Sequence, residues 1–175
     1  SCFVTRLVWL GDTSGPLLFG QEGDCGVGRS GKWCAIQQWG VEPDIFFVAK
    51  GIASGMPLGA MVARRSIMDC PTGAHGNTYG GNPLGAAVAS ANLDVFEEEN
   101  TLANLQPKIA RLAERLAGFA EHPHVGNVRQ RGMIAGIELV ADKASKRSFP
   151  RERQLGAAIC RRARSPGLFI RRLGD

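Results

Sequence analysis

The feature that most constrains the fold is a continuous apolar run, Ile45 to Ala49, that ends abruptly at Lys50-Gly51. A short apolar run that follows a turn signal, here Val41 to Asp44, is typical of a buried strand in a parallel sheet. We therefore expect an α/β fold in which residues 45–49 form a strand and Lys50 lies at its carboxyl end.

The segments on either side continue the α/β pattern. A proline suits the first position of a helix, so Asn82-Pro83 predicts the start of a long helix that ends near Asn100. Apolar residues at helical spacing predict a second helix over residues 102–121. Other expected elements are a strand remnant at 17–20, an apolar run at 58–63, a short helix at 64–69, strands at 125–128 and 133–140, a helix at 152–164 and a strand at 168–171.

The character of the chain changes near residue 100. Small residues and glycines dominate before it, and charged helix and strand patterns follow it. This change predicts two domains, residues 1–100 and residues 101–175.

Composition argues against several classes of protein. The 21 Lys and Arg against 16 Asp and Glu leave a net charge of +5 that is spread in short pairs, which favours a solvated basic surface over a nucleic-acid site. Five cysteines without a C-x-x-C pair favour neither disulfides nor zinc and predict a reducing, cytoplasmic setting. The apolar start, residues 2–10, is too short to span a membrane.

Two phosphate-loop patterns overlap in one glycine-rich segment. Residues 26–31 fit G-x-G-x-x-G, and with Lys32 they nearly fit the P-loop spacing. However, the residues that follow predict barely two helical turns, and Trp33 stands where a P-loop needs Ser or Thr. Nucleotide binding through Gly28 and Lys32 is therefore a minor alternative.

Lys50 is a candidate for covalent chemistry. Ligands collect at the carboxyl ends of strands in open α/β sheets, and desolvation there would lower the pKa of an amine. A neutral amine is the form that condenses with an aldehyde. Taken alone, a lysine at a strand end is more often a solvated boundary residue. The choice between this role and a catalytic one therefore depends on the sequence around Lys50.

The surrounding sequence resembles a known family. The run from Val41 to Ala60, with Ala49-Lys50-Gly51 at its centre, closely resembles the cofactor-lysine segment of class III aminotransferases. The run from His75 to Leu84 resembles the second hallmark of that family, and residues 28–33 resemble a third. The similarity covers roughly residues 26–175.

The resemblance implies a fold, a cofactor and two site residues. It implies part of the large domain of a fold-type I transferase, followed by a small α+β C-terminal domain. Lys50 would carry pyridoxal 5'-phosphate, and Thr78 would bind the phosphate of that cofactor in the neighbouring subunit of a homodimer. The implied reaction moves an amino group from a small-molecule donor to a keto acceptor. A glycine-bounded threonine before a helix N-terminus suits phosphate binding, although a local cap is its ordinary role.

The C-terminal segment narrows the implied substrate. Residues 149–171 are similar to adenosylmethionine-8-amino-7-oxononanoate aminotransferases, in which an arginine at the position of Arg171 meets the substrate carboxylate. This implies amination of 7-keto-8-aminopelargonate in biotin synthesis. Arg172 stands where that branch has proline, and aminotransferases of 4-aminobutyrate or other ω-amino acids share the motifs of Lys50 and Thr78.

One position departs from the family. Gln21 stands where the family has the aspartate that pairs with the cofactor's pyridine nitrogen, and glutamine brings no negative charge. Either Gln21 weakens the site, or Glu22 or Asp24 replaces the aspartate. We also expect this chain to be a fragment that lacks a complete, independent active site. A catalytically silent association module is therefore an alternative of another class.

Overall fold

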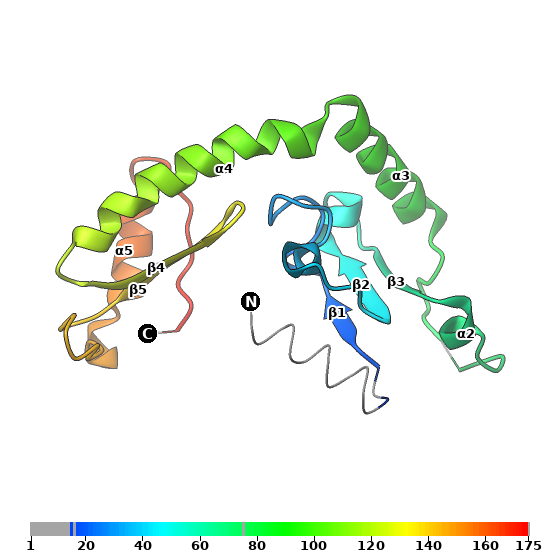
Figure 1. The fold of residues 1–175 in the computed structure, drawn as a ribbon, viewed down its shortest axis with the longest axis horizontal. Helices are drawn as coiled ribbons and strands as arrows, with labels where there is room; N and C mark the ends of the chain where they lie inside the picture. The colour runs from blue at the N-terminus through cyan, green and yellow to red at the C-terminus, as the bar shows by residue number, and fades with distance from the viewer. Residues whose placement is uncertain (1–14, 16, 75, 175) are drawn as a thin grey trace. The chain divides into compact units, whose positions relative to one another are not determined.

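A computed structural model describes residues 15, 17–74 and 76–174, which fall into two compact units (Figure 1). Of these residues, the first unit contains those up to Ala110 together with Arg131–Ile134. The second unit contains Arg111–Gln130 and the residues from Ala135 onward. The apolar start at residues 2–10 lies outside the described residues, and the domain limits of 1–100 and 101–175 stay a prediction.

The first unit is built on a three-stranded sheet of order β1-β2-β3. Strand β2 (Ile45–Ala49) has the predicted bounds and pairs in parallel with β1 (Phe19–Gln21) and antiparallel with β3 (Gly59–Ala63). The expectation of a buried strand is met only at Ile45, because the other four residues of β2 are half-buried. Three strands within one small unit have too few neighbouring elements to cover both faces.

The long helices confirm the sequence pattern closely. Helix α3 (Pro83–Glu98) begins at the predicted proline, and the Asn82 side chain accepts a hydrogen bond from the Leu84 N–H at 3.1 Å. Helix α4 (Thr101–Ala117) follows and buries Leu116. The shorter helices of the first unit are η1 (Ala35–Trp39), η2 (Lys50–Ala53) and α2 (Arg65–Met68).

The second unit has a core around Leu116, Val125 and Val140. Its elements are η3 (Gly118–Glu121), β4 (Val125–Arg131), β5 (Ile134–Leu139), η4 (Arg151–Arg153) and α5 (Leu155–Arg164).

Two expectations for the second unit need correction. The helix predicted at 152–164 is interrupted because Gln154 has a φ of 43°, in the left-handed region. The strand predicted at 168–171 is wrong, since no strand of the described residues pairs with that segment. A strand requires a neighbour for its backbone groups, and β5 pairs with β4 alone.

A buried carboxylate organises the chain after β1. Glu22 is 2% exposed, and its two oxygens accept hydrogen bonds from the N–H groups of Ala35 at 2.8 Å and Ile36 at 2.9 Å. These N–H groups belong to the first turn of η1, where a helix has no internal acceptors. Glu22 therefore ties the loop that follows β1 to the start of η1.

The turn between β4 and β5 packs onto the glycine-rich segment of the first unit. The Met133 N–H donates to the carbonyl of Arg29 at 2.9 Å, and the Arg131 guanidinium lies 5.7 Å from the ring centroid of Trp39. At Gly132 the backbone φ is +61°, and an added Cβ would lie 2.2 Å from the carbonyl carbon of Ser30. This close approach requires glycine.

We predict that Gly132→Ala lowers the free energy of unfolding by at least about 2 kcal/mol. The alanine would have to adopt a left-handed backbone conformation, and its Cβ would clash with the backbone of Ser30. Gly136→Ala is the matched control, since Gly136 lies in β5 with no atom within 4 Å of an added Cβ. Urea denaturation measures both variants. Equal stability of Gly132→Ala and wild type would contradict this packing.

We predict that Glu22→Gln lowers the free energy of unfolding by about 1–3 kcal/mol, because the amide replaces one acceptor by a donor and leaves a half-buried N–H of η1 without its partner. Glu42→Gln removes an exposed carboxylate in the same unit and should change stability by no more than about 0.5 kcal/mol. The same denaturation experiment compares the two. A stability loss in both variants would indicate a general charge effect instead.

Candidate functional site

Lys50 is the first residue of η2 and directly follows β2. Its backbone φ is 52°, and its Nζ lies 2.5 Å from Oδ1 of Asp24. The Lys50 side chain is 65% exposed, so the desolvated amine expected from the sequence is not found in this chain. The apolar strand ends before Lys50, and the described residues do not enclose its side chain.

A residue that the sequence did not single out supports the turn at Lys50. The Asn92 side chain, in the middle of α3, donates hydrogen bonds to the carbonyls of Gly51 at 3.0 Å and Ile52 at 3.2 Å. Its oxygen accepts one from the Ser54 hydroxyl at 2.8 Å. Asparagine is a poor helix former, so its place inside a helix of small residues was the available signal for a tertiary partner.

The three polar residues after β1 have different surroundings. Gln21 is the exposed last residue of β1 and is in register with Phe47 of β2. Glu22 cannot replace an aspartate facing a ligand, because its buried carboxylate is bound to the backbone of η1. Asp24 contacts the amine of Lys50. The parallel pairing of β1 and β2 thus brings the loop of Asp24 next to Lys50.

The glycine-rich segment is a packing surface in this structure. An added Cβ at Gly28 would lie 2.8 Å from the ring of Phe96, and one at Gly31 would lie 2.8 Å from Cδ1 of Ile109. The segment leads into η1, a short 3-10 helix, instead of the α-helix that a dinucleotide fingerprint needs. These glycines admit the side chains of α3 and α4, which explains them without a nucleotide.

Cys34, beside the glycine-rich segment, is not a nucleophile candidate. Burial raises the pKa of its thiol, and the nearby carboxylate of Glu22 raises that pKa further. A thiol with a raised pKa holds less of the reactive thiolate at neutral pH.

Thr78 lies in an exposed turn that leads to α3. The Gly80 N–H donates to the carbonyl of Asn77 at 3.0 Å, and the Tyr79 N–H donates to the Asn77 side chain at 3.1 Å. His75, which begins this sequence motif, lies outside the described residues. Within the part of the chain that the structure describes, no hydrogen bond joins Thr78 to Lys50 or Gln21.

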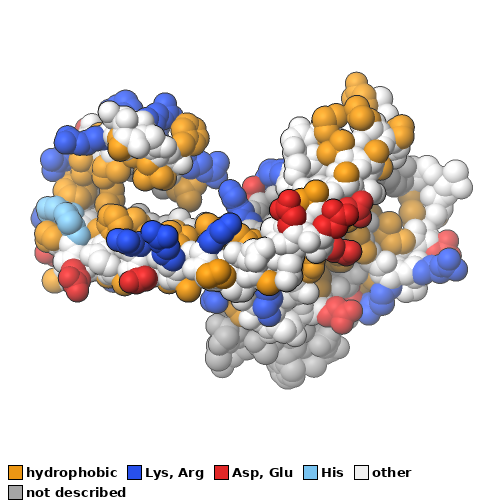
Figure 2. Space-filling model, turned by 90° about the horizontal axis from the view of Figure 1, so that it is seen from above, with side chains coloured by type: hydrophobic (Ala, Val, Ile, Leu, Met, Phe, Trp, Pro, Cys, Tyr) orange, Lys and Arg blue, Asp and Glu red, His pale blue; other side chains and the backbone are white. Residues whose placement is uncertain are grey.

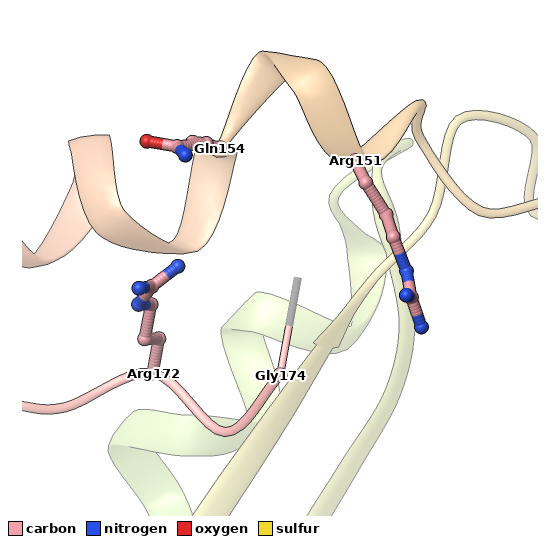
Figure 3. A pocket seen from close by; sticks show the side chains of 4 residues that line it. All are labelled: Arg151, Gln154, Arg172 and Gly174. Carbon is pink, nitrogen blue, oxygen red and sulfur yellow. The ribbon is translucent and has the colours of Figure 1, made fainter.

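The second unit contains a cavity of about 420 Å³ lined by Arg151, Gln154, Arg172 and Gly174. Figure 3 shows the Arg172 side chain extending from its loop toward the segment that carries Gln154, with Arg151 to one side. The predicted carboxylate-binding residue, Arg171, is exposed and is not among the lining residues.

The described residues contain neither a candidate metal centre nor a helix that could span a membrane. Residues 15, 17–74 and 76–174 contain no group of three or more His, Cys, Asp or Glu side chains that could hold a metal ion. No helix formed by these residues has the length and apolar character needed to cross a membrane.

Comparison with known proteins identifies relatives along the whole chain. The sequence profile of the family described as Aminotransferase class-III matches residues 2–175. The chain is 43% identical to the adenosylmethionine-8-amino-7-oxononanoate aminotransferase of Geobacter sulfurreducens, over 99% of this chain and 40% of that protein. It is 38% identical to the 4-aminobutyrate aminotransferase GabT of Escherichia coli, over 96% of this chain and 39% of that protein. The chain thus spans about 40% of the length of these relatives.

Solved structures show the same relationship. The (S)-enantioselective omega-transaminase from Thermomicrobium roseum superposes with a TM-score of 0.91 at 37% identity, over 98% of this chain and 40% of the transaminase chain. The sequence resemblance is therefore confirmed by both sequence and structure. This chain belongs to the class III aminotransferases, and its mixed α/β structure is part of the fold-type I aminotransferase fold.

Proposed function

We propose that this chain is the part of a class III aminotransferase that carries the cofactor lysine, Lys50. The observation that carries the proposal is the position of the Lys50 amine, at the carboxyl end of β2 and beside the loop that follows β1. This edge of a parallel pair is where ligands bind in α/β sheets. Hydrogen bonds from Asn92 fix the backbone of the turn that follows Lys50, and this fixes the position from which the Lys50 side chain extends.

We propose pyridoxal 5'-phosphate as the cofactor, in keeping with the family, which typically uses it. Lys50 fits this group because an aldehyde condenses with a primary amine. Thr78 fits its phosphate because the Thr78 turn leads to the N-terminus of the 16-residue helix α3. Gln21 fits less well, since a neutral amide at the position of the pyridine-pairing aspartate supplies no charge. Bound pyridoxal phosphate would supply the electron sink for bond cleavage at the amino carbon.

Lys50 has two roles in this proposal. Its Nζ would hold the cofactor covalently and orient it at the sheet edge. As a free amine, the same Nζ would carry a proton to and from the substrate carbon.

We propose that the whole protein works as a homodimer in which Thr78 serves the site of the other subunit. The side chains of Tyr79 and Leu84, on either side of the start of α3, are 80% and 58% exposed. Exposed apolar side chains of this size favour burial against a protein partner. Figure 2 shows apolar side chains exposed beside groups of Lys, Arg, Asp and Glu on the face that it draws.

For the whole protein we propose amination of 7-keto-8-aminopelargonate, supported by the similarity to the relative from Geobacter sulfurreducens. Arg171 would bind the substrate carboxylate through its planar guanidinium. Transamination of 4-aminobutyrate or another ω-amino acid is the alternative, supported by the similarity to GabT. The free thiols of Cys25, Cys34, Cys70 and Cys160 are in keeping with a cytoplasmic setting.

The silent-module alternative has support of its own. Gln21 supplies no negative charge to pair with the cofactor ring. Covalent trapping of the cofactor by the chain itself separates this alternative from a working cofactor site.

We predict that pyridoxal 5'-phosphate, followed by borohydride reduction, labels Lys50 selectively in the 175-residue chain. Peptide mass spectrometry locates the modified lysine. Lys50→Ala should lose nearly all of the label, whereas Lys32→Ala should keep it. Lys32 is a matched control in the same unit, and its Nζ donates to the carbonyl of Gln37. Scattered labelling, or none, would contradict the proposal and support the silent module.

We predict that Thr78→Val weakens the binding of pyridoxal 5'-phosphate by at least about tenfold, because a hydrogen bond to a charged group contributes about 1.5–3 kcal/mol. Pyridoxal, which lacks the phosphate, should bind the variant and the wild type equally. Thr72→Val is the control in the same loop. Titrations followed by cofactor absorbance give both affinities, and an equal loss for the two ligands would argue against a phosphate role.

A further inference from the structure

The ion pair of Asp24 and Lys50 joins the two loops at the carboxyl edge of the sheet. Oδ1 of Asp24 lies 2.5 Å from Nζ of Lys50, a short distance for a charge-assisted hydrogen bond. Asp24 follows β1 and Lys50 follows β2, and these two strands run in parallel. Asp24 and Lys50 are 26 positions apart in the sequence, so the fold, and not the local sequence, brings them together.

Backbone packing brings these two loops together independently of the long Lys50 side chain. An added Cβ at Gly51 would lie 3.5 Å from Cβ of Val27, and one at Gly23 would lie 3.9 Å from Cβ of Ala49. Asn92 holds the carbonyl of Gly51 from the side of α3. The positions from which the two charged side chains extend are therefore set by the fold of the first unit.

The nearby Glu22 does not compete for this amine. Its carboxylate is buried, and both of its oxygens accept backbone hydrogen bonds from η1. The acidic side chain in contact with Lys50 is thus that of Asp24.

We propose that Asp24 is a positioning residue that restrains Lys50 and slows its capture of an aldehyde. This inference rests on the proposed function of Lys50. The contact with Asp24 occupies the amine, which must be free and neutral before its lone pair can attack a carbonyl carbon. To react, Lys50 must leave Asp24 and release a proton to it or to water. The neutral Nζ then bonds to the aldehyde carbon, and the carbonyl oxygen departs as water.

The expected effect is moderate because the pair is accessible to water. The side chains of Lys50 and Asp24 are 65% and 75% exposed, and an ion pair in such surroundings is weakened by solvent and by salt. Removal of the Asp24 charge should therefore accelerate capture by about two- to fivefold at low ionic strength.

The test measures the rate at which Lys50 is labelled by pyridoxal 5'-phosphate, trapped with borohydride and quantified by mass spectrometry in the 175-residue chain. Borohydride transfers a hydride to the carbon of the new C=N bond, and water protonates the nitrogen, so the adduct becomes stable. The chains compared are wild type, Asp24→Asn, Asp24→Glu and Glu42→Gln. Glu42→Gln removes an exposed carboxylate before β2 and controls for the general loss of one negative charge.

Asp24→Asn should be faster than wild type at low salt, whereas Asp24→Glu and Glu42→Gln should remain close to wild type. Added sodium chloride should raise the wild-type rate relative to that of Asp24→Asn until the two converge, since salt screens an exposed pair. A role of Asp24 in folding alone would produce neither convergence nor rescue by glutamate. Thermal melting of each variant shows whether it is folded.

Two results would overturn the inference in distinguishable ways. Labelling of Lys50 at the same rate in wild type and Asp24→Asn, or a ratio of rates that does not change with salt, would show that Asp24 does not restrain the amine and would leave the proposed function intact. Absence of Lys50 labelling in wild type would overturn the proposed function and this inference with it.

Discussion

The parallel pairing of β1 with β2 is the interaction on which the candidate site depends. It aligns the ends of two strands that lie far apart in the sequence, so the loop of Asp24 reaches the amine of Lys50. Parallel strands leave their carboxyl ends at one edge of the sheet, where the following loops can converge. Asn92 of α3 and the buried carboxylate of Glu22 then hold the backbone of these loops in place.

The glycines of the first unit illustrate how one sequence pattern can serve two different purposes. Gly28 and Gly31 fit a phosphate-loop spacing, yet the missing side chains make room for Phe96 and Ile109. A phosphate loop needs free backbone N–H groups at the start of a following helix. The segment instead leads into a short 3-10 helix whose first N–H groups bind Glu22.

Much of the local structure followed from residue patterns. The apolar run of β2, the Asn82-Pro83 start of α3 and the amphipathic spacing of α4 each depend on neighbours within a few positions. Two predictions near the C-terminus failed for different reasons. The apolar segment at 168–171 forms no strand because it finds no strand to pair with. Gln154 breaks the last helix through its left-handed backbone, which the residue type did not indicate.

The family and the candidate residue Lys50 could be predicted from two long motifs. Each motif is a continuous stretch of the chain, so it can be recognised without the tertiary structure. The surroundings of that lysine could not be read in this way. The exposure of its side chain, its pairing with Asp24 and its support by Asn92 all arise from contacts between residues at least 26 positions apart. Such contacts form only when strand pairing and helix packing bring distant parts of the chain together, so residue order alone does not specify them.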